Sequence, residues 1–191
     1  MPSLTPPAEL LRVLTAVLRA LGVEWYVFGA QAVVYWGRPR FTEDIDVTVM
    51  ARDVEISKLV ATLQAAGFAV RPEGTADFIA RTRVIPLLHT DTDWPLDLVI
   101  GGPGLEEDFL RRSVPVEIGH GTPVRMIAAE DLIATKILAG RPKDLEDVRG
   151  ILAAQGATLR AEAVKHTLAM LEDALGVSDL IPTFERFFDR P

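Results

Sequence analysis

The chain has 191 residues, enough for one ordinary domain or one domain with a helical extension, and its hydrophobic fraction of 49% suffices for a sizeable core. It contains no cysteine, which excludes disulfides, thiolate zinc sites and cysteine nucleophiles. Its formal net charge of −7 disfavours general nucleic-acid binding, which depends on phosphate contacts, but permits a local basic rim around a site.

The N-terminal region and the apolar runs predict a protein without membrane association. Glu9, Arg12 and Arg19 interrupt the apolar residues near the N-terminus, which lacks a basic leader, so we expect no signal peptide. The uncharged run 25–37 is shorter than the roughly 20 residues that cross a bilayer. We therefore expect a cytoplasmic protein.

Hydrophobic periodicity predicts alternating helices and strands in the first two-thirds of the chain. Leucine and valine recur on one face of a predicted helix over 8–21, and the apolar run 24–28 predicts a strand. The elements predicted next, in chain order, are a buried helix over 30–36, a loop over 37–43, a strand over 44–50, a helix over 53–66, strands over 68–71 and 77–84, a polar loop over 89–93, a strand over 94–100, a helix over 105–112, and a hairpin with strands 114–118 and 122–126.

From Ile127 onward the periodicity is helical only. The predicted helices cover 128–139, Pro142 to about Ala154, and two later stretches, Val164 to Leu175 and Leu180 to Phe188. We therefore expect an α+β fold. Residues 1–126 form an α/β core with a mixed sheet flanked by helices, and residues 127–191 form a C-terminal helical bundle.

Two aspartates occupy alternate positions at the start of the predicted strand 44–50. Side chains two residues apart on a strand share a face, so Asp44 and Asp46 lie together, while Ile45 and Val47 point to the opposite face. Two unpaired like charges on an apolar strand cost several kcal/mol, roughly, without a cation. Because clustered carboxylate oxygens bind Mg²⁺, the pair predicts a metal site. The alternative is two solvated aspartates at a strand end.

Asp97 is likewise the polar residue of an apolar strand. If strand 94–100 lies beside strand 44–50, Asp97 joins Asp44 and Asp46 on one face. Three carboxylates can hold two Mg²⁺ ions about 3.5–4 Å apart for a phosphoryl displacement. Taken alone, Asp97 also fits an ordinary residue at a sheet edge, and the upstream pair favours the metal-binding interpretation.

Gly29 and Ala30 follow the apolar strand 24–28 and begin the predicted helix. Glycine allows a close backbone approach, and the amides at a helix start bind anions. The pair fits the phosphates of a nucleoside triphosphate bridged to the metal ions. The alternative is a simple turn after a strand.

This order of features resembles the signature of the nucleotidyltransferase superfamily of DNA polymerase β. That signature is a strand, a Gly-Gly or Gly-Ser pair, nine to thirteen residues, and Asp-hydrophobic-Asp/Glu-hydrophobic. The chain has Gly29-Ala30, thirteen residues, and Asp44-Ile45-Asp46-Val47, and Asp97 matches the third carboxylate. The resemblance implies a nucleotidyltransferase-like fold. Ala30 departs from the pattern, because a serine hydroxyl would contact a phosphate, whereas alanine offers only its backbone N–H.

The segment from Glu130 to Val148 narrows the resemblance. It is similar to the AbiEii/MenT-like nucleotidyltransferases of bacterial toxin–antitoxin and phage-defence systems, which implies active-site roles for Lys136 and Asp147. The residues themselves leave alternatives open. Lys136 fits a phosphate ligand or a lysine whose stem covers the core, and Asp147 fits a partner of Lys136 or of the substrate, or a surface pair with Lys143. Arg141 and Lys143 fit either added positive charge for phosphates or a solvated helix junction.

Together these features predict a Mg²⁺-dependent nucleotidyltransferase that takes a nucleotide from an NTP, with two ions in its site. We expect Asp44 and Asp46 to hold the metal ions and the triphosphate. Asp97 completes the metal site and helps to deprotonate the acceptor hydroxyl, and Asp147 orients Lys136 or the substrate. The expected phosphate ligands are Gly29, Ala30, Lys136 and Arg141.

The resemblance implies the 3′ end of tRNA as the acceptor and an antitoxin protein as a partner. Two other functions stay open: nucleotide transfer to a small molecule or a protein side chain, and a module that binds a nucleotide or partner without chemistry. The three carboxylates argue against the silent module, and Ala30 argues weakly for it. A candidate RNA-binding rim, with a solvated surface as its alternative, consists of Arg38, Arg40, Arg81, Arg83, Arg141 and Lys143.

Overall fold

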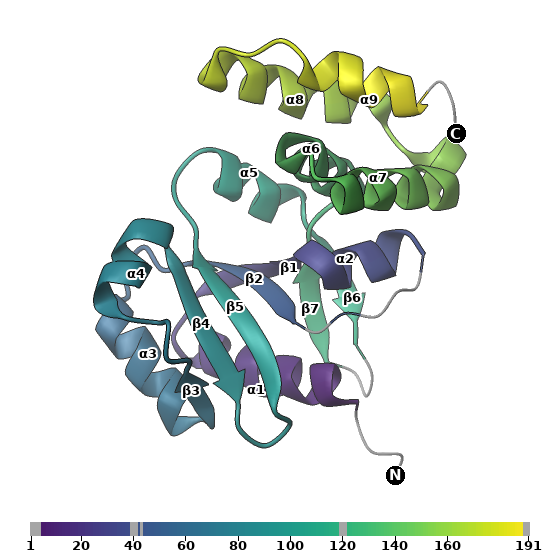
Figure 1. Cartoon of the computed structure of the whole chain (residues 1–191). Coiled ribbons are helices and arrows are strands. Elements are labelled where there is room, and N and C mark those ends of the chain that lie inside the picture. Colours follow the sequence, from purple (N-terminus) through teal and green to yellow (C-terminus); the bar gives the residue numbers. More distant parts are fainter. Residues whose placement is uncertain (1–4, 39–41, 43, 119–121, 189–191) are drawn as a thin grey trace. The chain divides into compact units, whose positions relative to one another are not determined.

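The computed structural model of the chain describes residues 5–38, 42, 44–118 and 122–188. The helices are α1 (Pro6–Ala20), α2 (Gly29–Trp36), α3 (Ile56–Ala65), α4 (Ala76–Thr82), α5 (Leu105–Arg112), α6 (Ala129–Ala139), α7 (Pro142–Gln155), the short 3₁₀ helix η1 (Gly156–Thr158), α8 (Ala161–Leu175) and α9 (Leu180–Phe188). The strands are β1 (Glu24–Phe28), β2 (Ile45–Met50), β3 (Phe68–Val70), β4 (Val84–His89), β5 (Trp94–Ile100), β6 (Val114–Glu117) and β7 (Pro123–Met126). Figure 1 shows these elements along the chain.

The chain divides into two compact units, and the division passes through α2. The first unit comprises residues 1–31 and 42–127 and contains the sheet. The second unit comprises residues 32–41 and 128–191, and all regular structure among its described residues is helical. The expected α+β fold is confirmed.

In the described part of the first unit, seven strands form one mixed sheet in the order β3-β4-β5-β2-β1-β7-β6. Strand β2 pairs with β1 in antiparallel and with β5 in parallel orientation. The even-numbered and odd-numbered positions of β2 point to opposite faces, and Ile45, Val47 and Val49 are fully buried on one of them. On that buried side β5 contributes Leu96 and Leu98, which are also fully buried.

Helix α1 contributes a leucine stripe to the core of this unit. Leu10, Leu14 and Leu18 recur every four residues, and none of them is exposed to solvent. The helix contacts β1, β5 and α3 (Figure 1). The stripe predicted for residues 8–21 is thus the surface that anchors the helix to the sheet.

Helix α6 is the central helix of the second unit and contacts α7, α8 and α9. Its apolar residues lie on several sides, and Leu132, Ile133 and Ala134 are consecutive yet fully buried. A helix that is apolar on most of its circumference is typically an interior helix. Figure 1 shows α6 beside α7, and α8 beside α9.

Most predicted elements agree with the structure. The strands over 24–28 and 94–100 and the helix over 105–112 have the predicted bounds, and most other elements agree to within one or two residues. Helix α3 begins later than the predicted residue 53, because Glu55 has an extended backbone and precedes its first turn. The hairpin turn predicted at 119–121 lies outside the described residues.

The strand predicted over 77–84 is wrong, since residues 76–82 form helix α4. The Thr75 hydroxyl accepts a hydrogen bond from the Phe78 N–H at 3.2 Å, which is a helix N-cap, and Arg83 ends the helix with a left-handed φ of 58°. None of the helix's residues is buried, so the alternation of apolar and polar residues reflects no buried face. The strand begins at Val84 instead and continues to His89, which the prediction had assigned to a loop.

Candidate active site

Asp46 and Asp97 are direct neighbours in the sheet. They are Cα partners in the parallel pair β2–β5, and partners in register present their side chains on the same face. Both lie on the side opposite the buried row of Ile45 and Leu96, and both are partly accessible to solvent. The strand adjacency on which the carboxylate prediction depended is therefore present.

Asp44 lies immediately before β2 and is also partly accessible. It is close enough to Asp97 to influence the titration of that carboxyl group. Burial raises the pKa of Asp97, the positive charge of Arg71 acts in the opposite direction, and the negative charges of Asp44 and Glu73 raise the pKa further. The net effect is a pKa above the ordinary value for this carboxyl group.

Gly29 lies against the Asp46 carboxylate. Its φ is +63°, and a Cβ at this position would lie 2.6 Å from Cγ of Asp46, so only glycine fits without displacing that side chain. The first turn of α2 is also tied to the segment before β2, because the Gln31 side-chain amide donates a hydrogen bond to Thr42 Oγ1 at 2.7 Å. Gly29 and Ala30 therefore begin a helix directly beside one carboxylate of the pair.

Arg71 is a site residue that the sequence did not identify. It follows β3, and its guanidinium donates a hydrogen bond to Asp97 Oδ1 through one Nη, while the other Nη lies 3.3 Å from Glu73 Oε1. The two side chains of the Arg71–Asp97 pair keep 28% and 33% of their surface exposed. The pairing depends on the strand order β3-β4-β5, which no local pattern contains. The only local signal is a basic residue at the end of a short apolar run.

The donor chemistry of this cluster fits a divalent cation. Asp44, Asp46 and Asp97 offer hard carboxylate oxygens, and Asp46 and Asp97 are register partners on adjacent strands. As the side chains stand, no group of three or more histidine, aspartate or glutamate residues within the described ranges is assembled tightly enough to hold an ion. The Arg71 guanidinium supplies the positive charge at Asp97.

A second cluster of charges lies in the helical unit, at the junction of α6 and α7. Lys136 Nζ is 2.9 Å from Asp144 Oδ1 and 2.9 Å from Asp147 Oδ2. Arg141, which precedes α7, donates from Nε to Asp144 Oδ2 at 2.5 Å. The left-handed φ of 64° at Gly140 turns the chain between the two helices and brings these groups together.

The interior part of this cluster is removed from solvent. The side chains of Lys136, Asp144 and Asp147 expose 10%, 0% and 7% of their surface, so Asp147 is a buried partner of Lys136 rather than part of a surface pair. Burial alone would raise the pKa of Asp144, but the hydrogen bonds and charges of Arg141 and Lys136 outweigh it. The pKa of this carboxyl therefore lies below its usual value.

Asp144 is the second residue that the sequence missed, although a signal for it exists. It lies three residues before Asp147 on α7, and residues at this spacing share a helix face. The buried position of Asp147 thus implies a similar position for Asp144. Lys136 and Arg141, predicted as phosphate ligands, both donate to Asp144 in the structure, and their role toward phosphates stays a prediction.

The basic residues predicted as a rim have different surroundings. Arg81 pairs with Asp77 at 3.0 Å, and Arg83 lies 3.9 Å from Glu106, so their charges are partly balanced. Arg38 and Lys143 are exposed residues of the helical unit, and the Arg141 side chain, although 61% exposed, pairs with the buried Asp144. Arg40 lies outside the described residues.

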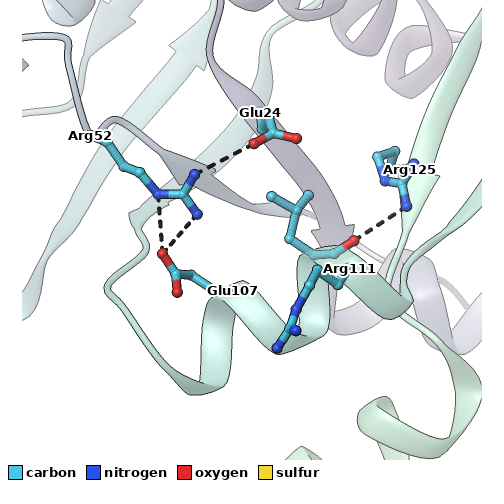
Figure 2. Close-up of a pocket in the computed structure, with 6 residues that line it drawn as sticks. Glu24, Arg52, Glu107, Arg111 and Arg125 are labelled. Atoms are coloured by element: carbon cyan, nitrogen blue, oxygen red, sulfur yellow. Dashed lines mark hydrogen bonds and ion pairs between the residues drawn. The ribbon is translucent and has the colours of Figure 1, made fainter.

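The first unit also contains a polar pocket of about 520 Å³ (Figure 2). Its arginines already have partners: Arg52 lies 2.8 Å from Glu107 and 3.7 Å from Glu24, Arg111 pairs with Asp108, and Arg125 donates a hydrogen bond to the Leu110 carbonyl. Glu24 begins β1, whereas the Gly29 site follows its other end, so the two places are separated by the length of a five-residue strand, roughly 13–17 Å. The pocket is not part of the carboxylate site.

The first unit thus combines a mixed sheet, a helix that begins at a glycine beside one carboxylate, and a second carboxylate in register. A comparison with protein families matches residues 12–186 to the family described as nucleotidyl transferase AbiEii toxin, type IV toxin–antitoxin system. The chain belongs to this AbiEii family, and the resemblance inferred from the residues is confirmed.

Solved nucleotidyltransferase structures share the fold. The structure of ANT(2″)-Ia in complex with adenylyl-2″-tobramycin has a TM-score of 0.61 at 19% identity, over 90% of this chain and 99% of that chain. The lincosamide antibiotic adenylyltransferase LnuA with bound lincomycin gives 0.53 at 14% identity, over 79% and 98% of the two chains. An antigenic nucleotidyltransferase-like protein from Paracoccidioides brasiliensis gives 0.54 at 19% identity, over 93% and 91%.

A comparison with curated protein sequences gave no match. Among the residues that the structure describes, none of the helices has the length and apolar character needed to cross a membrane.

Proposed function

We propose that this chain transfers a nucleotide from a nucleoside triphosphate to an acceptor hydroxyl at the site formed by Asp44, Asp46 and Asp97. The observation that carries the proposal is the register of Asp46 and Asp97 on one face of the sheet, with Gly29 against Asp46. A divalent ion such as Mg²⁺, when bound by these carboxylates, supplies charge stabilisation for the transferring phosphoryl group.

The residues of the chain have distinct roles in this reaction. The backbone at Gly29 and Ala30 binds and orients the triphosphate, since a helix start presents free N–H groups. Asp97 accepts the proton of the acceptor hydroxyl, whose oxygen then forms a bond to the α-phosphorus. The bond from the α-phosphorus to the bridging oxygen breaks, and pyrophosphate leaves.

Lys136 and Asp147 have a supporting role in the proposal. Lys136 has one ammonium N–H beyond the two directed at Asp144 and Asp147, and Arg141 is a further donor with a largely exposed side chain. These donors bind phosphate oxygens of the nucleotide or the acceptor, with Asp147 fixing the position of Lys136. Asp144 and Asp147 also keep this region from being strongly basic.

Two classes of acceptor follow from different observations. Membership of the AbiEii toxin family favours the 3′ end of tRNA as acceptor and an antitoxin as a cellular partner. The solved neighbours that contain an adenylyl-tobramycin product and lincomycin favour a small hydroxylated acceptor. We propose RNA as the primary acceptor and a small molecule as the second candidate.

The test is transfer of label from each of the four α-³²P-labelled nucleoside triphosphates in the presence of Mg²⁺. The acceptors are total tRNA, a protein extract, and an RNA-free small-molecule fraction. Label on tRNA is the expected result, and label only on small molecules or protein identifies the other acceptor class. Asp46→Asn should abolish transfer. The matched control is Asp77→Asn, which removes a carboxylate that is 78% exposed on α4 and should leave transfer unchanged.

If no acceptor is labelled, and Asp46→Asn leaves nucleotide binding unchanged, the chain is a binding module and the proposal fails. The rim is tested separately by combining Arg38→Ala with Arg40→Ala. Loss of these charges should weaken tRNA binding and reduce its salt dependence. An unchanged salt slope would remove the rim from the proposal.

A further inference from the structure

Arg71 lies on the same cross-sheet row as the proposed metal ligands. Its backbone N–H donates to the Pro86 carbonyl at 2.9 Å, and Pro86 is the register partner of Asp97, which in turn is the partner of Asp46. The row therefore runs from Arg71 through Pro86 and Asp97 to Asp46. This placement brings one permanently positive side chain to the carboxylates proposed to bind a cation.

The contacts of the guanidinium make it an exchangeable counter-ion. It hydrogen-bonds Asp97, and its other branch lies 3.3 Å from Glu73. Its Nε is buried and has no hydrogen-bond partner among the described residues, so the side chain is not fully satisfied where it lies. Because about a quarter of the side chain is exposed, it can turn without unfolding the sheet.

We propose that Arg71 couples metal binding to nucleotide binding. A free divalent ion must displace the Arg71 guanidinium from Asp97. The displaced guanidinium then remains near the bound cation, which has the same sign of charge, so the ion alone binds weakly. A metal–nucleotide complex brings a cation for Asp97 and, in its triphosphate, an anion for the released Arg71. The inference rests on the proposed nucleotide transfer and assigns its site a positioning residue that makes metal and nucleotide bind together.

The experiment measures Mn²⁺ binding by the electron paramagnetic resonance signal of free Mn²⁺. Each protein is titrated alone and with saturating triphosphate analogue whose α and β phosphates are joined by a methylene group. In the wild type the analogue should tighten Mn²⁺ binding at least about tenfold, a typical size for coupling between ligands. Arg71→Gln should tighten the binding of Mn²⁺ alone at least about fivefold and reduce the tightening by the analogue to about twofold or less.

Three further variants separate direct competition from general charge effects. Arg12→Gln removes an exposed arginine that pairs with Glu9 on α1, and should leave both affinities unchanged. Arg71→Lys keeps the charge but not the planar fork, and should have an intermediate effect. In an Asp97→Asn background, Arg71→Gln should no longer strengthen the binding of Mn²⁺, because the carboxylate for which the two cations compete is gone.

The outcomes distinguish this inference from the proposed function. If Asp46→Asn abolishes Mn²⁺ binding but Arg71→Gln changes neither affinity nor coupling, the metal site stands and the role of Arg71 is overturned. Equal effects of Arg71→Gln and Arg12→Gln would also overturn it. If neither the wild type nor Arg71→Gln binds Mn²⁺, with or without the analogue, both the metal site and the role of Arg71 fall.

Discussion

Gly29→Ala is the substitution that most directly tests the geometry of the candidate site. At a φ of +63° an alanine incurs left-handed strain of about 1–2 kcal/mol. Its Cβ would also lie 2.6 Å from Asp46 Cγ, where an ordinary contact needs about 3.4 Å or more. The carboxylate must therefore move by roughly 1 Å, a displacement that can reduce a reaction rate about 100-fold.

Gly22→Ala provides a matched control. Gly22 has nearly the same φ, +66°, but nothing lies within 4 Å of its added Cβ. Both variants should lose about 1–2 kcal/mol of unfolding free energy from backbone strain, measured by urea denaturation. Only Gly29→Ala should also lose Mn²⁺ affinity and transfer label about 100-fold more slowly. If it transferred label as fast as Gly22→Ala, the contact between Gly29 and Asp46 would have no part in catalysis.

Three further predictions concern stability. Lys136→Met leaves two buried carboxylates without their ammonium partner and should lower the free energy of unfolding by about 3–5 kcal/mol in urea, whereas the exposed Lys58→Met should stay within about 0.5 kcal/mol of wild type. The pKa of Asp144 in the folded state lies below the unfolded-state value near 3.8, so its carboxylate stabilises the fold at pH values above 3.8. This stabilisation is lost as the pH falls through the folded-state pKa. The stability difference between wild type and Asp144→Asn should therefore shrink from pH 6 to pH 3, and a constant difference would contradict the ion-pair account. Thr75→Ala should cost about 1 kcal/mol through loss of the α4 cap, while Thr62→Ala, on the exposed side of α3, should not; equal effects would argue against the cap.

The sequence was most informative where a local pattern and the fold demand the same structure. The apolar run 94–100 is short, β-branched in part and followed by glycines, and it forms β5 with the predicted bounds. The alternation of Asp46 with apolar residues likewise predicted which face it occupies, since Asp46 lies opposite the buried Ile45 and Val47. Asp97 could be placed beside Asp46 only on the condition that strand 94–100 pairs with strand 44–50, because the order of strands in a sheet cannot be read from a local pattern.

The error at 77–84 shows how a local alternation can mislead. Phe78, Ala80 and Thr82 alternate with Ile79 and two arginines, as in a half-buried strand, yet no residue of α4 is buried. The Thr75 hydroxyl accepts a hydrogen bond from the Phe78 N–H, and this N-cap favours a helical turn over the extended backbone that the alternation predicts. A threonine followed by an aspartate two residues later was the available signal for a helix start.

Arg71 and Asp144, one in each charge cluster, were not predicted from the sequence, for different reasons. Asp144 could have been found from its helical spacing to Asp147, whereas Arg71 reaches Asp97 only through the intervening strand β4. The clusters also differ in what they can do. In the helical unit, Lys136 and Arg141 balance Asp144 and Asp147, and the interior side chains are at most 10% exposed.

A balanced and buried network resists exchange of its partners, because each released charge would remain without water. The Arg71–Asp97 pair, with 28% and 33% exposure, can open to solvent or to a ligand at much lower cost. Substitutions at Lys136 should therefore destabilise the helical unit, while those at Arg71 should change ligand binding in a folded protein. Measuring stability beside Mn²⁺ affinity for both positions separates the two, and unfolding by Arg71→Gln as severe as that by Lys136→Met would refute the distinction.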